Sequence, residues 1–423
     1  MNPLPSLPWY SGLPARWLPT FVAVLIAIAP ETFAAQISDR GLAFLEARVK
    51  ADPDDFTAWN LLAERYLAKL RETGDNAWSD RAGQAADASL KVVEARFNPG
   101  GLGCRARVDL AMHRFIEARD RATQWRRLQP DKSAPLETLG DALFELGDLE
   151  EAAGVYEELR AREGDAPGIE ARLAKLALSR GKREEALAHF TAALELARAV
   201  SPEAPQLVAW CEVQLGELAF RAGQWEEAES HYQAALVLQP GGWAATEHLA
   251  ELRGAQGRAA EAIRLYEEVI SKTNRPELSQ ALGDLYLFLQ RNGEAKPWHD
   301  RALAAYLADI EKGHVRYLHH LAGFYCDSRE NPAGAVEMAR RDLALRHTAQ
   351  AHEALAWALY KSGDVAGAAL EITRALESGL RDSHIHYHAG LIRISAGNLA
   401  AGQEIMREAA RINPRFNAFH VHR

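Results

Sequence analysis

The chain has 423 residues, of which 48% are hydrophobic and 25% are charged, a composition typical of folded rather than disordered proteins. The formal net charge of −9 argues against nucleic acid and against an anionic membrane surface as the main partner, because both require a basic face. The length suits two or three ordinary domains or one long repeat array.

The three cysteines, Cys104, Cys211 and Cys326, are widely spread along the chain. Their odd number and wide spacing exclude a disulfide framework and a cysteine-ligated zinc site. We expect small buried side chains at these positions, with a single disulfide as the alternative in an oxidising compartment.

The N-terminal segment has the order of a secretory signal peptide. Arg16 precedes an unbroken apolar run at residues 21–29, Pro30 ends that run, and small residues suited to cleavage follow at Ala34 and Ala35. We expect cleavage there and an exported protein, periplasmic or secreted, with no stable membrane insertion afterwards. The alternative is an anchor formed by an uncleaved N-terminal segment.

Small residues recur along the chain at a nearly fixed period. Ala or Gly, in most cases preceded by Leu, stands at Ala63, Ala106, Gly140, Ala174, Gly216, Ala250, Gly283, Ala322, Ala356 and Gly390. Six of the nine steps between these positions are 33 or 34 residues long. Twelve residues after the second and each later position, another small residue stands at Ala118, Ala152, Ala186, Ala228, Ala262, Ala295, Gly334, Ala368 and Gly402. A period of this length indicates a repeat architecture.

A large side chain follows four residues after most of these second positions, at Tyr156, Phe190, Tyr232, Tyr266, His299, Ile372 and Met406. Helices cross closely only where side chains are small, so we predict helix pairs that cross at the small residues. The large side chain, one helical turn further on the same face, fills the space between units. The longer step before Gly216 contains two prolines within residues 201–205, which predicts a lengthened helix and then a sharp turn.

This pattern resembles the tetratricopeptide repeat family, whose unit of 34 residues folds as helix–turn–helix. The clearest unit is 211–240, with Gly216 and Ala228 at the small positions and Tyr232 after the second of them. The resemblance implies an all-α fold, a right-handed superhelical solenoid of about ten helix–turn–helix units.

The N-terminal pattern and the repeats together divide the chain into four parts. We expect a signal peptide at 1–35, an N-terminal capping helix at 36–52, the repeat array at 53–414 and a tail at 415–423. In the tail, Phe416, Phe419 and Val421 stand among polar residues. We expect this tail to fold back over the apolar face of the last helix.

Catalytic motifs are absent from the sequence. It contains no phosphate-binding loop, no nucleophile elbow and no paired-histidine zinc motif of metalloproteases, so we predict that the chain is not an enzyme and needs no cofactor.

Eleven of the fifteen histidines lie between His299 and the C-terminus. His384 and His388 share a helix face, and His420 and His422 lie in the tail, so these four are candidate ligands for zinc, copper or nickel. Ordinary packing and surface roles are the favoured interpretation, and a metal-handling accessory protein is the alternative function.

In tetratricopeptide repeats the first helix of each unit lines a concave groove. The central position of that helix, and those four before and after it, share one face. These positions hold Glu137, Asp141, Glu145, Glu217, Glu247, Glu251, Asp284, His319, Trp357 and Tyr387. The lining is acidic in the middle and aromatic toward the C-terminus, which favours a protein or peptide partner that is basic or carries aromatic or apolar anchors. The sequence therefore predicts a protein-binding scaffold of the cell envelope. For the acidic residues of the lining, the alternative is that they form only a solvated surface.

Overall fold

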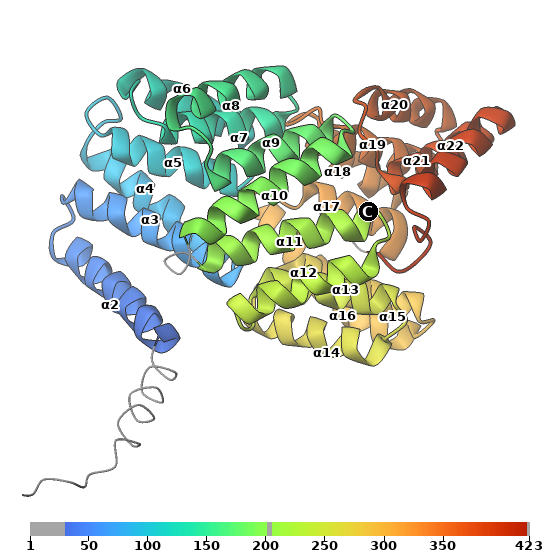
Figure 1. Cartoon of the computed structure of the whole chain (residues 1–423), viewed down its shortest axis with the longest axis horizontal. Coiled ribbons are helices and arrows are strands. Elements are labelled where there is room, and N and C mark those ends of the chain that lie inside the picture. The colour runs from blue at the N-terminus through green and yellow to red at the C-terminus, as the bar shows by residue number, and fades with distance from the viewer. Residues whose placement is uncertain (1–29, 201–204, 421–423) are drawn as a thin grey trace, which may run out of the picture.

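The computed structural model describes residues 30–200 and 205–420, and every regular element in these ranges is a helix (Figure 1). Residues 1–29, which hold most of the expected signal peptide, lie outside them. The helices are α2 (Pro30–Ala51), α3 (Phe56–Thr73), α4 (Ala77–Val92), α5 (Pro99–Ala111), α6 (Phe115–Leu128), α7 (Ala134–Leu146), α8 (Leu149–Glu163), α9 (Pro167–Ser179), α10 (Arg183–Val200), α11 (Pro205–Arg221), α12 (Trp225–Leu238), α13 (Trp243–Ala255), α14 (Ala259–Lys272), α15 (Pro276–Phe288), α16 (Asn292–Glu311), α17 (Leu318–Gly323), α18 (Pro332–Leu343), α19 (Ala349–Lys361), α20 (Val365–Glu377), α21 (Ser383–Ser395) and α22 (Leu399–Ile412). The all-α prediction is confirmed.

Ten helix pairs follow α2 in the part of the chain that the structure describes. They run from α3 with α4 to α21 with α22, and each pair packs on the next to form a solenoid. In the eighth pair the first helix, α17, continues directly into a π-helical turn, Phe324–Ser328. The predicted architecture of about ten helix–turn–helix units is confirmed. The single helix α2 precedes them, and it begins at Pro30 rather than at the expected residue 36.

The two helices of a unit touch at the predicted small residues. A Cβ atom on Gly140 would lie 2.5 Å from Cε1 of Tyr156, and a Cβ atom on Gly216 would likewise collide with the ring of Tyr232. The Tyr232 ring also stacks on His248 of the next unit, with 5.6 Å between ring centroids. The large side chain thus packs against its own unit as well as between units, because the glycine of the first helix leaves a gap that the ring fills.

The eighth unit departs from the predicted register. Ala335 on α18 is fully buried, whereas Gly334, the residue predicted at the helix crossing, is only partly buried. The π-helical turn Phe324–Ser328 accounts for this shift, because a π turn holds one residue more than an α turn and moves the following helix on by one position.

Two second helices are longer than the rest. α10 has 18 residues and α16 has 20, whereas the other second helices have 12 to 16. The lengthened helix that the sequence predicts before the proline-containing segment is therefore confirmed as α10. The turn itself, at residues 201–204, lies outside the described residues.

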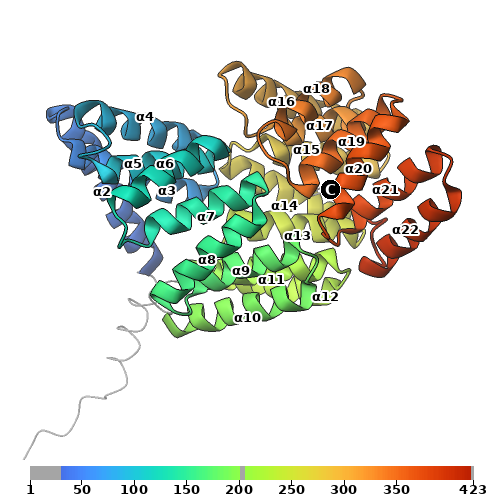
Figure 2. The ribbon, with the colours of Figure 1, turned by 90° about the horizontal axis from the view of Figure 1, so that it is seen from above.

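The solenoid coils until its second turn lies against its first (Figure 2). The backbone N–H of His347 donates to the carbonyl of Leu146 at 2.9 Å, and the side chain of Asn274 donates to Asp75 at 3.2 Å across 199 residues of sequence. In both contacts a loop inside a unit of the first turn meets a loop between units of the second turn. About six units therefore complete one turn, and the regular repeat length keeps successive loops in register.

Glycines in these first-turn loops allow the close approach. Gly147 has φ +94°, and a Cβ atom there would lie 3.0 Å from the carbonyl of His347. Gly74 has φ +69°, and a Cβ atom there would lie 2.8 Å from the indole ring of Trp243. Two separate constraints require glycine in each of these loops. Its backbone is left-handed, and the next turn of the solenoid occupies the space of a side chain.

A buried ionic cluster joins the two turns. Arg316, which is 7% exposed, donates through Nε to both oxygens of Asp309 at 3.2 Å and through Nη1 to Ser79 of the first turn at 2.8 Å. Although burial opposes it, the carboxylates of Asp309 and Asp80 raise the pKa of the Arg316 guanidinium. Arg316 therefore stays charged and connects α4 to the loop before α17.

Replacing Arg316 by Met should lower the free energy of unfolding by about 3–5 kcal/mol, because Asp309 keeps its buried charge without its main partner. Urea denaturation followed by circular dichroism measures this loss, and small-angle X-ray scattering should show a larger radius of gyration as the turns separate. The matched control is Arg96→Met in the exposed pair with Glu94, for which we expect about 0–1 kcal/mol. Equal unfolding midpoints for the two variants would contradict the role of the cluster.

Candidate binding surface on the first helices

The first helices form the inner side of the curved array. Direct contacts join α3 with α5, α5 with α7, α11 with α13, α17 with α19, and α19 with α21. Second helices of adjacent units show no comparable contact in the described residues, so they lie on the outer side. All ten residues that the sequence assigned to the groove lie on first helices, and none of them is fully exposed.

The acidic residues of α7 face an arginine of the next unit. Arg172 on α9 donates to both oxygens of Asp141, at 2.7 and 2.8 Å, and its guanidinium lies 3.7 Å from Glu137. Glu145 lies one turn further along α7. Burial raises the pKa of Glu145, against the opposing charges of Arg346 and Lys175.

The acidic residues of α11, α13 and α15 also have partners inside the protein. Glu217 pairs with Arg221 at 2.7 Å, and Asp284 accepts hydrogen bonds from Ser328 at 2.6 Å and lies 2.9 Å from His299. Glu247 is 6% exposed and Glu251 only 1%, and Glu251 lies 2.6 Å from Nδ1 of His420 in the tail.

These carboxylates therefore form a stripe whose charge is largely balanced from within. The sequence showed the carboxylates, because they recur on one face of the first helices of four units. It did not show the arginines and the tail histidine that face them, because those partners come from other positions of the unit and from other units.

Toward the C-terminus the lining is aromatic, as expected. Trp357 stacks on His388 with 3.7 Å between ring centroids, and its Nε1 donates to Asp327. Tyr387 lies 5.4 Å from the ring of Phe416. His319 lies at hydrogen-bond distance from Asp342, 3.3 Å away. Although burial opposes it, His319 and Arg346 lower the pKa of Asp342.

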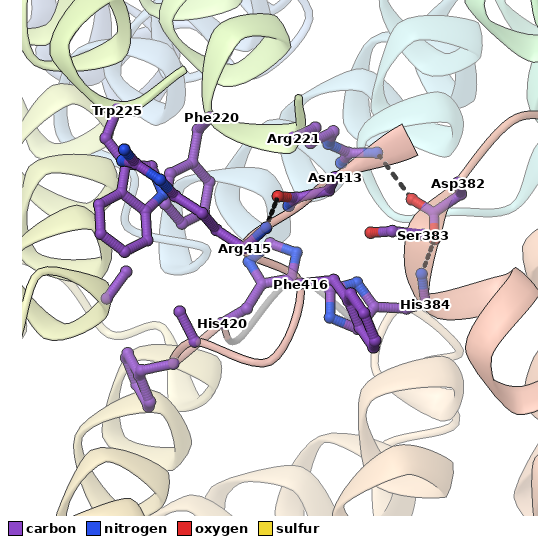
Figure 3. Close-up of a pocket in the computed structure, with 13 residues that line it drawn as sticks. Phe220, Arg221, Trp225, Asp382, Ser383, His384, Asn413, Arg415, Phe416 and His420 are labelled. Carbon is purple, nitrogen blue, oxygen red and sulfur yellow. Dashed lines mark hydrogen bonds and ion pairs between the residues drawn. The ribbon is translucent and has the colours of Figure 1, made fainter. Parts of the chain in front are cut away.

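The C-terminal tail lies on this inner surface. After α22 the chain turns back toward the middle of the array, where Arg415 and Phe416 pass between Trp225 and His384 (Figure 3). Arg415 lies 4.2 Å from the centre of the Trp225 ring. The tail thus crosses from the last unit to the units of α11 to α15.

Phe419 anchors the tail. Its side chain is 1% exposed and belongs to the apolar core formed by α11 to α16. A Cβ atom on Gly254 would lie 2.5 Å from Cδ1 of Phe419, and the ring of Phe288 lies 5.6 Å away. Glycine at position 254 therefore provides the space that the phenyl ring occupies.

The prediction that the tail folds back over the last helix is wrong about which helices the tail covers. The tail does fold back, but Phe419 packs on α13 and α15, while Leu399 of α22 stays 57% exposed. The reason lies in the coiling of the array, because the second turn brings the end of α22 next to the α11–α12 loop. There the side-chain oxygen of Asn413 lies 2.6 Å from the Cβ position of Gly223.

Charged groups converge where the tail meets the two turns. Arg221 on α11 lies 4.0 Å from Asp382 at the start of α21, and the rings of His384 and His420 stack with 4.6 Å between centroids (Figure 3). Burial opposes ionisation of Asp382, but its neighbours His384 and Arg221 hold its pKa below the usual value. This junction therefore brings together charged and titratable side chains from α11, the start of α21 and the tail.

The four candidate metal ligands do not converge. His384 and His420 lie together, but Nδ1 of His388 lies 2.5 Å from Glu353, and His422 falls outside the described residues. No group of three or more His, Cys, Asp or Glu side chains in the described ranges could hold a metal ion.

The cysteine expectation is confirmed. Cys104, Cys211 and Cys326 are buried and free, and burial raises the pKa of the Cys211 thiol to about 11. Such thiols act as small packing residues rather than as nucleophiles.

Comparison with known families agrees with this geometry. One family model described as tetratricopeptide repeat matches residues 166–239, and a second with the same description matches 105–167, 213–278 and 353–415. This chain is built from tetratricopeptide repeats. No curated protein sequence matches the repeat array.

Solved structures of similar fold include yeast Tom70, which is 11% identical with a TM-score of 0.38 over 84% of this chain and 92% of that one. The APC/C hetero-tetramer Cut9–Hcn1 is 11% identical with a TM-score of 0.36 over 91% and 92%. A tetratricopeptide repeat protein from Parabacteroides merdae is 18% identical with a TM-score of 0.35 over 70% and 98%. Within the described residues, no helix of the present array is long and apolar enough to cross a membrane.

Replacing Phe419 by Ala should lower the free energy of unfolding by about 2 kcal/mol, less than the roughly 3–5 kcal/mol of a core phenylalanine, because a segment outside the helices can leave its site while the helices stay folded. Thermal denaturation measures the change, and truncation after Pro414 should have a similar effect. The control is Phe97→Ala, since Phe97 is 67% exposed and should change stability by less than about 0.5 kcal/mol. A control variant as unstable as Phe419→Ala would contradict the anchoring role.

Proposed function

We propose that this chain is a protein-binding scaffold of the cell envelope that holds a segment of a partner protein on the first helices of its repeats. The tetratricopeptide array supports the general role, because stacked helix pairs present a long continuous surface and bind through it. The envelope location is supported by the order of basic, apolar and small residues at the N-terminus. Catalysis has no part in this proposal.

The observation that carries the proposal is that the inner surface already accommodates a short peptide segment. The tail inserts Phe419 into an apolar site made by α13 and α15, and His420 meets Glu251 at 2.6 Å. An apolar pocket beside charged side chains is the arrangement by which grooves recognise peptides, since the pocket supplies affinity and the charges fix register.

Affinity capture tests the scaffold role. The full chain carries an affinity tag inserted after Gln36, so that the tag is retained whether or not the preceding segment is removed. We expect one saturable partner in envelope extracts, whose capture is reduced at least tenfold by Trp357→Ala together with Tyr387→Ala. The matched control is Val237→Ala on the outer helix α12, because Val237 is 80% exposed and lies away from the inner surface.

N-terminal sequencing of the recovered protein tests the location in the same experiment. A mature N-terminus near Ala34 or Ala35 in the envelope fraction would support export. Partner capture that responds equally to the inner and the outer variants would contradict binding on the first helices, and recovery from the cytosol with Met1 intact would contradict the envelope.

A further inference from the structure

We propose that Arg415–His420 is an intramolecular ligand that occupies the recognition site of the array, and that the partner competes for this site with a segment of the same chemistry. That segment carries two aromatic residues three positions apart and a histidine or another hydrogen-bond donor directly after the second. The inference rests on the proposed function and deepens it, because it names the class of segment that is bound and the device that controls access.

The shape of the site supports this specificity. Phe419 is 1% exposed and fills the space that the missing side chain of Gly254 leaves on α13. Phe416, three positions earlier, reaches Tyr387 on α21 with 5.4 Å between ring centroids. The two rings therefore bind to first helices that are four units apart, α13 and α21, and the spacing of three positions lets one short segment reach both.

The charges of the tail match those of the site. His420 lies 2.6 Å from Glu251, and the guanidinium of Arg415 lies 3.9 Å from Glu226 and 4.2 Å from the centre of the Trp225 ring. Cations next to carboxylates and over an indole ring are favourable. Buried Glu251 thus has the tail residue His420 as a partner in addition to His248 of the array, which lies 3.9 Å away.

The fit is nearly complete. The cavity left between the tail and the array has about 10 Å³, lined by Phe220, Arg221, Trp225 and tail residues (Figure 3). A cavity of this size is close to the smallest that holds one water molecule. The site therefore has no room for a second ligand while the tail is bound, and binding of the partner requires displacement of the tail.

The tail can leave without unfolding a helix. The backbone hydrogen bonds that we find for it stay within the segment, from Phe416 N–H to the carbonyl of Asn413 and from Ala418 N–H to that of Arg415. Side chains alone thus fix it to the array in the described residues. Tethering gives such a segment an effective concentration of the order of millimolar, so a competitor must bind the site more tightly than the tail does.

Fluorescence anisotropy with a labelled peptide of residues 413–423 tests the proposal. The tail is released in the full chain by Phe416→Ser together with Phe419→Ser, a double variant whose fold is checked by circular dichroism. We expect the peptide to bind this variant saturably, and at least tenfold more weakly to the unaltered chain, because the tethered tail blocks the site. Replacing Phe419 by Ser in the peptide should abolish binding.

Two glycine substitutions locate the site. Added to the tail-released variant, Gly254→Ala should weaken peptide binding at least tenfold, because its methyl group takes the space of the phenyl ring. The matched control is Gly154→Ala on α8, whose Cβ position has nothing within 4 Å, and it should leave the affinity unchanged. The proposal would be overturned if the folded tail-released variant did not bind the peptide. It would also be overturned if Gly254→Ala left the affinity for the peptide unchanged.

A second measurement covers the case in which the double variant does not fold. In the unaltered chain, millimolar peptide should accelerate hydrogen exchange at residues 415–420, and Gly254→Ala alone should accelerate it without peptide. Unchanged exchange in both would overturn the inference. Concentration-dependent dimers of the unaltered chain that Gly254→Ala abolishes would also overturn it, since a second copy would then be the occupant.

Failure of the tail proposal can be distinguished from failure of the scaffold proposal. A partner that is captured equally by the unaltered and tail-released chains would contradict tail control and leave the scaffold role intact. Peptide binding in trans without any captured protein would contradict the scaffold role instead.

Discussion

The structure depends on the close contact between the two helices of each unit. Where Gly140 and Gly216 lack a side chain, the rings of Tyr156 and Tyr232 lie against the helix backbone. This contact fixes the distance and the angle between the helices, and its repetition fixes the curvature of the whole array. Because the interior is close-packed, a small change at one crossing would be carried into every later unit.

Curvature in turn creates the contact between turns. After about six units the solenoid meets its own first turn, and loops inside units of the first turn then face loops between units of the second. Gly147 against His347, and Arg316 against Ser79, show that this contact is built from backbone and from buried polar groups as well as from apolar side chains. A solenoid that contacts itself in this way is stiffer than an open one, since its units no longer interact with their neighbours alone.

The tail site follows from this coiling. It takes Gly254 from the sixth unit and Tyr387 from the tenth, so it needs units that are far apart in sequence. The acidic stripe that lines the inner surface is compensated by Arg172, Arg221 and His420, so this surface does not present a bare negative field.

The sequence by itself determined the repeat unit, the helix pairs, the buried small residues and the inward position of Glu251 and Trp357, because these depend on periodicity within about 34 residues. Tertiary structure alone decided the rest. The register of Ala335 depends on a π turn, the partners of the acidic residues come from other units or positions, and the landing site of Phe419 is set by how far the array coils. The local sequence pattern fixes the angle between neighbouring helices, but only the sum of these angles over the whole array determines which distant residues meet.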